Sequence, residues 1–297
     1  MRLGAPWHML LHYLNHPMGR LDRAGTMARI LRWQLGSRML KAPAIMPYVD
    51  DLRLVVETGM HGATGNAYVG LMEFNDMAFV AHLLREDDVF LDIGANVGTY
   101  SLLAASRGAR VIAMEPVPGS YEALLDNVNL NRLQARIDAR NLGVGGKRGK
   151  LEFSTSGGPT NHVVPAGAPV EGTIAAAVDT LDRIAEYTPP TMIKIDVEGF
   201  EAAVIEGATA TLSQASLLAL LIELNGLGAR YGYNDSEIHL NLVSRGFHPV
   251  SYDPFQRRTT RLDHHNPKVN TLYLRRSSEV DIRLKEAHPI LWRNVSI

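Results

Sequence analysis

Short apolar runs alternate with segments of helical periodicity along most of the chain from residue 75 onward. This alternation predicts an α/β fold in which helices cover both faces of a mostly parallel, seven-stranded sheet. The expected strands span residues 89–93, 110–114, 136–142, 191–196, 217–223, 248–252 and 270–275, with a separate hairpin near 150–154 and 173–178. The expected helices span residues 75–84, 97–107, 118–131, 180–187, 199–206 and 234–245. No helix is expected between the last two strands, so the final strand should be antiparallel.

Residues 1–74 lack this alternation and predict an N-terminal helical and hairpin extension, followed by a domain of residues 75–297. Residues 6–41 predict one or two helices with a break at the Pro17-Met18-Gly19 segment. Two apolar stretches within residues 50–72, separated by a glycine-containing segment, predict a β-hairpin.

Composition narrows the class of protein further. A chain of 297 residues with 46% hydrophobic residues can bury a large core, and a net charge of −1 excludes a globally basic surface, so we expect no nucleic-acid partner. The absence of cysteine excludes disulfides and thiolate metal sites and agrees with a cytoplasmic location. No apolar run reaches about 18 residues, so we expect no transmembrane segment. Homo-oligomerisation is left open.

Charge is unevenly distributed along the chain. Residues 1–41 contain seven Lys/Arg and the single acid Asp22, a net charge of +6, which leaves −7 for the rest. A basic helical arm can contact an acidic membrane, an anionic substrate or the acidic body of its own chain. A solvated helical face that covers the main domain is the simplest interpretation.

Acidic residues stand where several expected strands end. Four of the apolar runs close on an acid, namely Asp92, Glu115, Asp196 and Glu223. Ligands of doubly wound sheets bind outside the carboxyl ends of the strands, where the strand order reverses. Charges beside a buried core are costly unless they are used or paired. The four acids therefore predict a ligand site at this edge of the sheet.

The turn Asp92-Ile-Gly94-Ala-Asn96-Val-Gly98 argues against a dinucleotide. A G-x-G-x-x-G fingerprint needs a glycine where the backbone approaches the pyrophosphate, and Asn96 holds that position. Carboxylates such as Asp92 favour the ammonium and sulfonium groups of S-adenosylmethionine, whose own carboxylate can use backbone N–H groups at a helix start. Glu115 lies 17 residues after Gly98, a spacing that suits a carboxylate accepting both ribose hydroxyls.

Longer segments resemble a known family. FLDIGANVGTYSLLAA, VIAMEP, LLDNVNLN, TLDRI, IKIDVEGFEAAVIEGA and LLIELN, in this order between about Asn66 and Tyr252, resemble the FkbM family of S-adenosylmethionine-dependent methyltransferases. The resemblance implies a class I methyltransferase (Rossmann-like) fold and methylation of a hydroxyl on a sugar, glycan or secondary metabolite. It also implies cofactor contacts from Asp92, Gly94, Ala95, Asn96, Gly98, Glu115, Pro116, Asn141, Gly143 and Asp196.

The segment Lys-Ile-Asp-Val-Glu-Gly is the expected place of the chemistry. The cofactor supplies the methyl group, whereas the protein has to align the acceptor and help to remove its proton. Lys194, Asp196 and Glu198 alternate, so an extended strand places them on one face. A lysine inside a central strand indicates pairing with a nearby acid. We expect general base catalysis by Asp196 or Glu198.

A metal-assisted site is an alternative that we do not favour. Asp196, Glu198 and Glu223 offer oxygen ligands of the kind that Mg²⁺ binds, with a substrate hydroxyl completing the shell. His162 is a further candidate base, because histidine titrates near neutral pH. The candidate residues for binding the acceptor are Asn161, Glu223 and Asn225.

The sequence thus predicts an S-adenosylmethionine-dependent O-methyltransferase with a small-molecule or glycan acceptor. One rival keeps the fold but methylates a nitrogen or carboxylate of a peptide or small molecule. Another is an NAD-dependent oxidoreductase, and a third is a non-catalytic protein that retains the cofactor fold. Titration with NAD and S-adenosylmethionine separates the second rival from the prediction, and an activity assay excludes the third.

Overall fold

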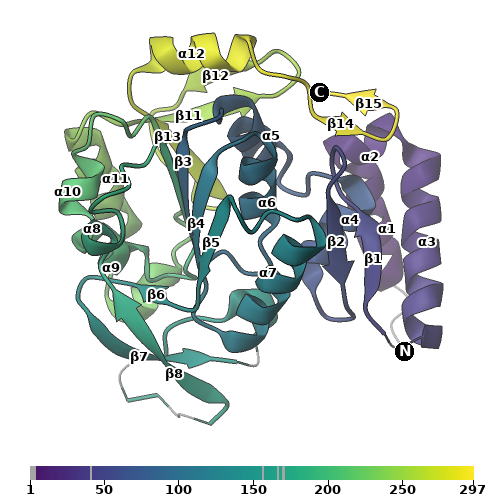
Figure 1. Ribbon diagram of the computed structural model, residues 1–297, viewed down its shortest axis with the longest axis horizontal. Helices are drawn as coiled ribbons and strands as arrows, with labels where there is room; N and C mark the ends of the chain where they lie inside the picture. The colour runs from purple at the N-terminus through teal and green to yellow at the C-terminus, as the bar shows by residue number, and fades with distance from the viewer. Residues whose placement is uncertain (1–4, 41, 156, 166, 169–170) are drawn as a thin grey trace.

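The computed structural model describes residues 5–40, 42–155, 157–165, 167–168 and 171–297, so Arg2 and Lys41 of the basic arm lie outside the described residues. An eight-stranded sheet with the order β12-β11-β13-β10-β9-β3-β4-β5 forms the centre (Figure 1). Its strands are β3 (Val89–Ile93), β4 (Arg110–Met114), β5 (Ile137–Arg140), β9 (Met192–Ile195), β10 (Ala219–Glu223), β11 (His248–Asp253), β12 (Arg258–Arg261) and β13 (Asn270–Leu274).

The sheet is mostly parallel, as the pattern predicted. Strands β5, β4, β3, β9 and β10 run in one direction. Strand β13 runs antiparallel between β10 and β11, which confirms the antiparallel final strand. Strand β12 adds an eighth member at the edge by pairing with β11. The apolar pattern missed it because its four residues, Arg-Thr-Thr-Arg, bury no apolar side chain.

Helices cover both faces of the sheet (Figure 1). One face carries α5 (Phe74–Leu83), α6 (Thr99–Ser106) and α7 (Pro118–Leu130), and the other carries α8 (Leu181–Ile184), α9 (Glu201–Glu206), α10 (Thr209–Leu212) and α11 (Asp235–Ser244). Successive side chains of a strand point to opposite faces. Accordingly, Phe90 belongs to the hydrophobic core on the first face, and Leu91 to the core on the second.

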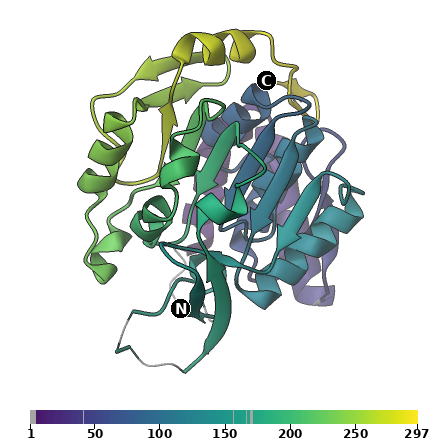
Figure 2. The same cartoon turned by 60° about the vertical axis from the view of Figure 1, so that its left-hand side comes forward.

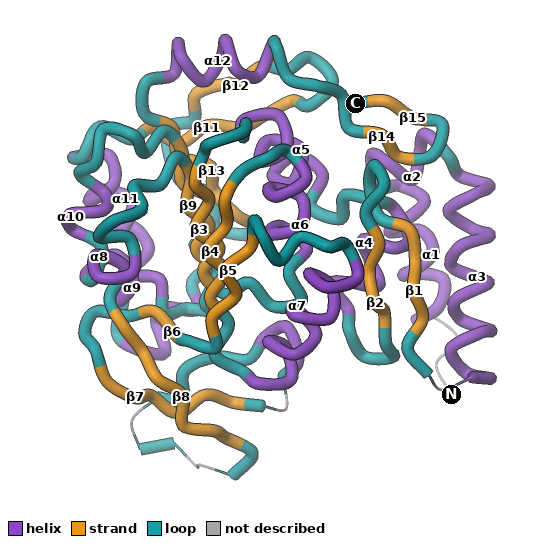
Figure 3. Tube along the Cα trace, in the orientation of Figure 1, coloured by secondary structure: helices purple, strands orange, loops and turns teal. Residues whose placement is uncertain are grey.

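The N-terminal extension packs outside the first helical layer, farthest from the sheet (Figure 3). It contains α1 (Ala5–Asn15), α2 (Pro17–Leu21), α3 (Arg23–Leu40), β1 (Ala44–Pro47), β2 (Arg53–Val56) and α4 (His61–Val69). Met18 and Trp33 of the extension belong to the same hydrophobic core as Phe90. The extension is therefore packed onto the sheet domain through buried apolar contacts. The domain boundary at residue 74 stays a prediction.

The predicted hairpin within residues 50–72 is wrong. Strand β2 pairs antiparallel with β1, and the second half of the segment is helix α4. The prediction takes the glycines of this segment as turn residues. Gly65, however, has no positive φ and serves close packing, because a Cβ there would lie 2.9 Å from the sulfur of Met72. Helical spacing of the buried residues Ala63 and Ala67 agrees with this packing role.

Smaller elements complete the structure. Strands β6 (Gly143–Val144), β7 (Gly149–Ser154) and β8 (Thr173–Asp179) form a separate sheet in the order β6-β8-β7, and its β7–β8 hairpin projects from the body (Figure 2). The remaining elements are η1 (Gly158–Thr160), η2 (Leu227–Tyr231), α12 (Ser277–Lys285), β14 (Leu291–Trp292) and β15 (Val295–Ser296). Within the described part of the chain, no helix has the length and hydrophobicity needed to cross a membrane.

The strand order reverses between β3 and β9. From β3 the chain continues to β4 and β5 on one side, and it then returns to β9 and β10 on the other. The carboxyl ends of β3 and β9 consequently lie side by side at the topological switch point, where sheets of this class bind ligands.

Candidate functional site

A hollow of about 360 Å³ opens at the carboxyl ends of β3, β4, β9 and β10. Its lining includes the predicted residues Gly94, Ala95, Asn96, Glu115, Pro116, Asn161, His162, Lys194, Asp196, Glu198 and Glu223. The predicted residues outside the lining are Asp92, Gly98, Asn141, Gly143 and Asn225. Residues more than 100 positions apart in the chain are thereby brought together around one cavity.

The turn after β3 requires three residues in the left-handed region. Gly94, Asn96 and Gly98 have φ angles of 77°, 49° and 86°, and asparagine tolerates this region better than most side chains. The carbonyl of Asp196 approaches so closely that a Cβ on Gly94 would lie 1.9 Å from its oxygen. A Cβ on Gly98 would lie 2.3 Å from Leu124 Cδ1. The glycines therefore let the turn meet the end of β9 and begin α6.

Substitution of Gly94 by alanine is expected to destabilise the fold by about 2–3 kcal/mol, because it combines left-handed strain with a backbone clash. Thermal unfolding measures the effect. The matched control is Gly149→Ala, since Gly149 has no positive φ and a Cβ there would meet no atom within 4 Å. Equal melting temperatures for the two variants would contradict the close approach of β9 to the turn.

Glu115 joins the turn to the end of β4. Its Oε2 accepts a hydrogen bond of 2.9 Å from the N–H of Asn96, and its Oε1 accepts one of 2.9 Å from the N–H of Val117. Burial raises the pKa of Glu115 to about 7, against the lowering effect of these two hydrogen bonds. Each carboxylate oxygen retains a second lone pair, so Glu115 can still accept from a ligand hydroxyl in the hollow.

Asp92 lies beneath the hollow and not in its wall. It is 1% exposed, and Ser101 of α6 donates a hydrogen bond of 2.6 Å to its Oδ2. Burial raises the pKa of Asp92, whereas the nearby Lys194 lowers it. Asp92 therefore acts on the site through Lys194 and through the position of α6.

Asn141 and Gly143 support the wall from behind. The Asn141 amide donates hydrogen bonds of 2.9 Å and 3.0 Å to the carbonyls of Glu115 and Pro116. A Cβ on Gly143 would lie 2.8 Å from the ring of Phe153, which lines the hollow. Both residues thus hold lining residues in place without lining the hollow themselves.

Lys194 is a buried cation surrounded by the acidic residues of the site. It is 3% exposed, its Nζ lies 2.9 Å from Asp196 Oδ2, and it also stands 5.0 Å from the centre of the Tyr100 ring. Burial alone would lower the pKa of Lys194, but the carboxylates of Asp196, Asp92 and Glu73 outweigh it and raise the pKa. The lysine in the central strand is therefore paired, as the sequence indicated.

Three carboxylates converge on one side of the hollow. Ligand oxygens of Asp196, Glu198 and Glu223 all lie within 4.8 Å of one another, and all three residues are half-buried. Burial and the neighbouring Asp196 raise the pKa of Glu198 to about 7 and that of Glu223 to about 8. Glu198 and Glu223 can therefore exchange protons near neutral pH, and the oxygen atoms of the three carboxylates are also a set that a divalent cation could bind.

A strained turn holds Glu198 at the cluster. Glu198 and Gly199 have φ angles of 55° and 99°, and a Cβ on Gly199 would lie 2.7 Å from the carbonyl of Leu227. The Glu201 carboxylate accepts hydrogen bonds from the N–H groups of Val197 and Gly199 at 3.0 Å and 3.2 Å. The hydrogen bonds to Glu201 and the close approach of Leu227 thus fix the backbone that carries Glu198.

The loop after β7 brings two further predicted residues to the hollow. The ring of His162 places Nδ1 3.0 Å from the carbonyl of Thr160, which favours a proton on Nδ1 and leaves Nε2 as the basic nitrogen. Asn161 Oδ1 accepts from the N–H of Gly157 at 2.9 Å. Asn225, in contrast, turns its Oδ1 to the N–H of Leu227 at 3.0 Å and stays outside the lining.

Sequence reasoning missed a further acidic residue in the lining of the hollow, Glu73. Glu73, just before α5, accepts a hydrogen bond of 2.7 Å from the hydroxyl of Tyr100, and the amide of Asn270 lies 3.4 Å from its Oε1. Burial raises the pKa of Glu73, and it raises that of Asp76 to about 7. Neither acid ends a strand, so the strand-end pattern carried no signal for them.

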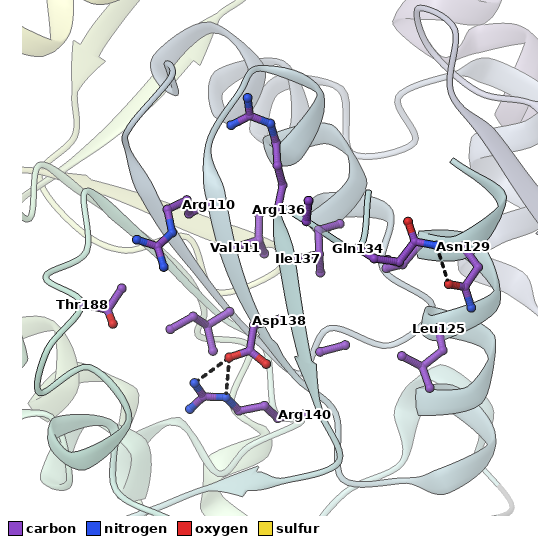
Figure 4. Close-up of a pocket in the computed structure, with 14 residues that line it drawn as sticks. Arg110, Val111, Leu125, Asn129, Gln134, Arg136, Ile137, Asp138, Arg140 and Thr188 are labelled. Atoms are coloured by element: carbon purple, nitrogen blue, oxygen red, sulfur yellow. Dashed lines mark hydrogen bonds and ion pairs between the residues drawn. The ribbon is translucent and has the colours of Figure 1, made fainter. Parts of the chain in front are cut away.

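A second hollow lies along the edge strand β5, away from these residues (Figure 4). Its polar groups are largely paired with one another. Arg140 donates to Asp138 at 2.7 Å and 3.0 Å, and Gln134 donates to Asn129 at 2.8 Å. None of the predicted site residues lines it, so it supports no catalytic role.

Comparison with known proteins agrees with this geometry. The profile of the Methyltransferase FkbM domain matches residues 92–249, which is more than half of the chain and covers the glycine turn, Glu115 and the carboxylate cluster. The chain belongs to the FkbM methyltransferase family. The resemblance drawn from the sequence segments is thereby confirmed, and the NAD-dependent oxidoreductase is excluded as an interpretation.

Two curated relatives of this FkbM family protein each match part of its sequence. The hexuronic acid methyltransferase AglP of Haloferax volcanii is 30% identical over 141 residues, which are 46% of this chain and 57% of AglP. The 31-O-demethyl-FK506 methyltransferase FkbM of Streptomyces tacrolimicus is 36% identical over 96 residues, 30% of this chain and 37% of that enzyme. The chain thus spans only about a third to three fifths of these curated relatives.

Among solved structures, the methyltransferase FkbM from Methylobacillus flagellatus KT covers 86% of this FkbM family chain at 17% identity, and 61% of that structure is matched. The TM-score is 0.43. The class I methyltransferase fold rests on the strand order and on the family match.

Proposed function

We propose that this FkbM family protein is an S-adenosylmethionine-dependent O-methyltransferase whose acceptor is a hydroxyl of a sugar, glycan or secondary metabolite. One observation carries the proposal. The glycine turn with Glu115 and the cluster of Asp196, Glu198 and Glu223 line the same hollow. A cofactor seat and a group of proton acceptors thus share one cavity, as transfer to a hydroxyl requires.

The residues of the turn fit S-adenosylmethionine. Bound there, the cofactor supplies an electrophilic methyl group. Glu115 would accept the ribose hydroxyls, and Ala95, Asn96 and Pro116 would contact the nucleoside and methionine parts from the lining. Gly94 and Gly98 let the turn approach β9 and α7 closely, because a Cβ there would lie 1.9 Å from the Asp196 carbonyl oxygen and 2.3 Å from Leu124 Cδ1.

Glu198 is the better placed of the two candidate bases. Asp196 already forms an ion pair with the Lys194 ammonium at 2.9 Å. The pKa of Glu198 is raised to about 7, close to the value at which a general base is most effective at neutral pH. In the proposed step Glu198 accepts the hydroxyl proton while Asp196, held by Lys194, orients the acceptor. His162 would assist from the opposite loop.

The charges of the hollow favour a neutral polyhydroxylated acceptor. Asp196, Glu198, Glu223 and Glu73 all line it, and Lys194, which is already paired, is the fixed positive charge among its described lining residues. Carboxylates accept hydrogen bonds from sugar hydroxyls, but they repel an anionic acceptor such as a uronate. A uronate would fit only if a cation lay between its own carboxylate and the carboxylates of the hollow.

The direct test is methyl transfer from labelled S-adenosylmethionine to a panel of neutral sugars, uronates and hydroxylated metabolites. Label is expected in an ether that withstands mild base. Label released by mild base would indicate a carboxylate ester, and label on an amine acceptor would likewise overturn the O-methyl proposal.

Removal of divalent metal is expected to leave most of the activity on a neutral acceptor, because Glu198 and Lys194 provide proton acceptance and charge balance without an ion. Turnover is measured after EDTA treatment, with and without added Mg²⁺. A loss of activity that Mg²⁺ restores would instead assign the three-carboxylate cluster as a metal site.

A further inference from the structure

The outer face of α3 exposes large apolar side chains to solvent. Met27, Leu31, Leu35 and Met39 are spaced four residues apart, so they follow one another along one side of the helix. Their exposed fractions are 40%, 53%, 62% and 83%. Figures 1 and 3 place α3 at the outer edge of the molecule, on the side away from the sheet.

The fold does not need this face. The opposite side of α3 supplies the packing, since Thr26, Ile30 and Trp33 are all at most 8% exposed. Helix α3 therefore has two apolar sides, whereas a helix that only covers a core presents polar residues to solvent. A run of four large apolar side chains on the solvent side indicates a surface that binds something.

The charges around the exposed stripe are positive and uncompensated. Helix α3 contains no acidic residue. Asp22, the one acid of residues 1–41, forms an ion pair with Arg29, whose Nη1 lies 2.9 Å from Asp22 Oδ2. Arg23, Arg32 and Arg38 are exposed, and none of them forms an ion pair with a residue in the described ranges. The stripe is thus bordered by free guanidinium groups.

Two adjoining hollows extend the same surface toward β1. Arg29, Arg32 and Arg293 line both of them. The more apolar one, of about 390 Å³, is lined by Trp33 and by Ile45 with its neighbours in β1. Guanidinium groups bind phosphate oxygens in pairs. An anionic head group at the arginines and an acyl chain beside Trp33 would match this arrangement.

A second copy of the chain fits this face less well than a lipid surface does. A two-fold contact through the stripe would place α3 against α3 and bring arginines together with no acid on either helix. A bilayer of anionic lipids provides both an apolar layer and negative charge, which basic amphipathic helices require.

We propose that the outer face of α3, with Met27, Leu31, Leu35 and Met39 inserted and Arg23, Arg32 and Arg38 at the phosphates, docks the protein on the surface of an anionic phospholipid bilayer. The helix lies in the plane of the interface and does not span it. The proposal is independent of the methyl-transfer reaction, because no residue of the hollow at β3 and β9 takes part.

Vesicle flotation of the full-length protein tests the proposal. The protein should float with vesicles of equimolar phosphatidylcholine and phosphatidylglycerol. With vesicles of pure phosphatidylcholine it should remain in the bottom fraction. Exchange of Arg23, Arg32 and Arg38 for glutamine should lower the partition coefficient about a hundredfold, since each charge near an anionic surface contributes about fivefold. The double variant Leu31→Ser and Leu35→Ser should lower it at least about tenfold.

Matched controls use residues elsewhere on the surface. Lys147, Arg148 and Lys150 form another exposed basic group, and their exchange for glutamine removes the same number of charges. Leu240 and Ile282 are exposed by 64% and 58% and serve as the apolar control. Both controls should keep wild-type partitioning, and thermal unfolding should show that all variants remain folded.

Three results would overturn the proposal. The first is equal flotation with neutral and anionic vesicles, and the second is equal loss of binding in the arm variants and the controls. The third is absence of flotation together with a dimer in solution that Leu31→Ser and Leu35→Ser dissociate, which would make a second copy the occupant of the face.

Discussion

Exchange of Glu198 for glutamine is expected to lower kcat by about 10²–10⁴-fold, the usual contribution of a positioned general base. The amide keeps the size of the side chain but cannot accept the acceptor's proton. Cofactor affinity should change little, because Glu198 stands at the carboxylate cluster and not at the glycine turn. Single-turnover rates with saturating S-adenosylmethionine measure the chemical step directly.

The pH dependence provides a second readout for Glu198. A base works in its deprotonated form, and the pKa of Glu198 is raised to about 7 by burial and by Asp196. The wild-type rate should therefore fall as the pH drops below about 7 and level off above it. In Glu198→Gln this inflection should disappear.

A second acid near the site provides the control for Glu198→Gln. Glu206 is an exposed acid on the neighbouring helix α9, so Glu206→Gln should keep the wild-type kcat. Asp196→Asn should also lose turnover, because it removes the partner of Lys194. Wild-type turnover in both Glu198→Gln and Asp196→Asn would reject a base on this strand end and would favour an acceptor, such as an amine, that needs little help from a base.

Exchange of Glu115 for glutamine is expected to raise the Kd for S-adenosylmethionine by about 100-fold. Two charge-assisted hydrogen bonds to the ribose hydroxyls contribute about 1.5–3 kcal/mol each, and the amide can accept only one of them without charge. Isothermal titration measures the change, and kcat at saturating cofactor should stay near the wild-type value.

Glu115 also braces the turn through the N–H groups of Asn96 and Val117. A thermal-unfolding comparison therefore has to accompany the titration. Glu122, exposed on α7, is the control, and Glu122→Gln should bind the cofactor normally. Since the carboxylate is the binding form and its pKa is raised to about 7, wild-type affinity should weaken below pH 7. Unchanged affinity in Glu115→Gln would remove Glu115 from the cofactor site.

The sequence by itself determined seven of the eight strands of the central sheet and the edge at which the strand-end acids meet. Apolar runs marked β3, β4, β5, β9, β10, β11 and β13 to within a few residues, and the signal is most continuous in the central parallel strands, which are buried on both faces. The acids that close these runs had to meet at one edge, since parallel strands end at the same side of a sheet. The apolar pattern was therefore enough for features that depend on a single strand or a single turn.

Tertiary structure decided what depends on contacts between distant segments. Helix α4 stands where a hairpin was predicted, and its Gly65 packs against Met72 and against the hydroxyl of Tyr13, 52 positions earlier in the chain. Glu73 reaches the site through Tyr100 and Asn270, which lie 27 and 197 positions away. The choice between Asp196 and Glu198 likewise rested on burial and on the Lys194 pairing, since both the desolvation and the electric field at a carboxylate are set by the surrounding fold and not by its own segment.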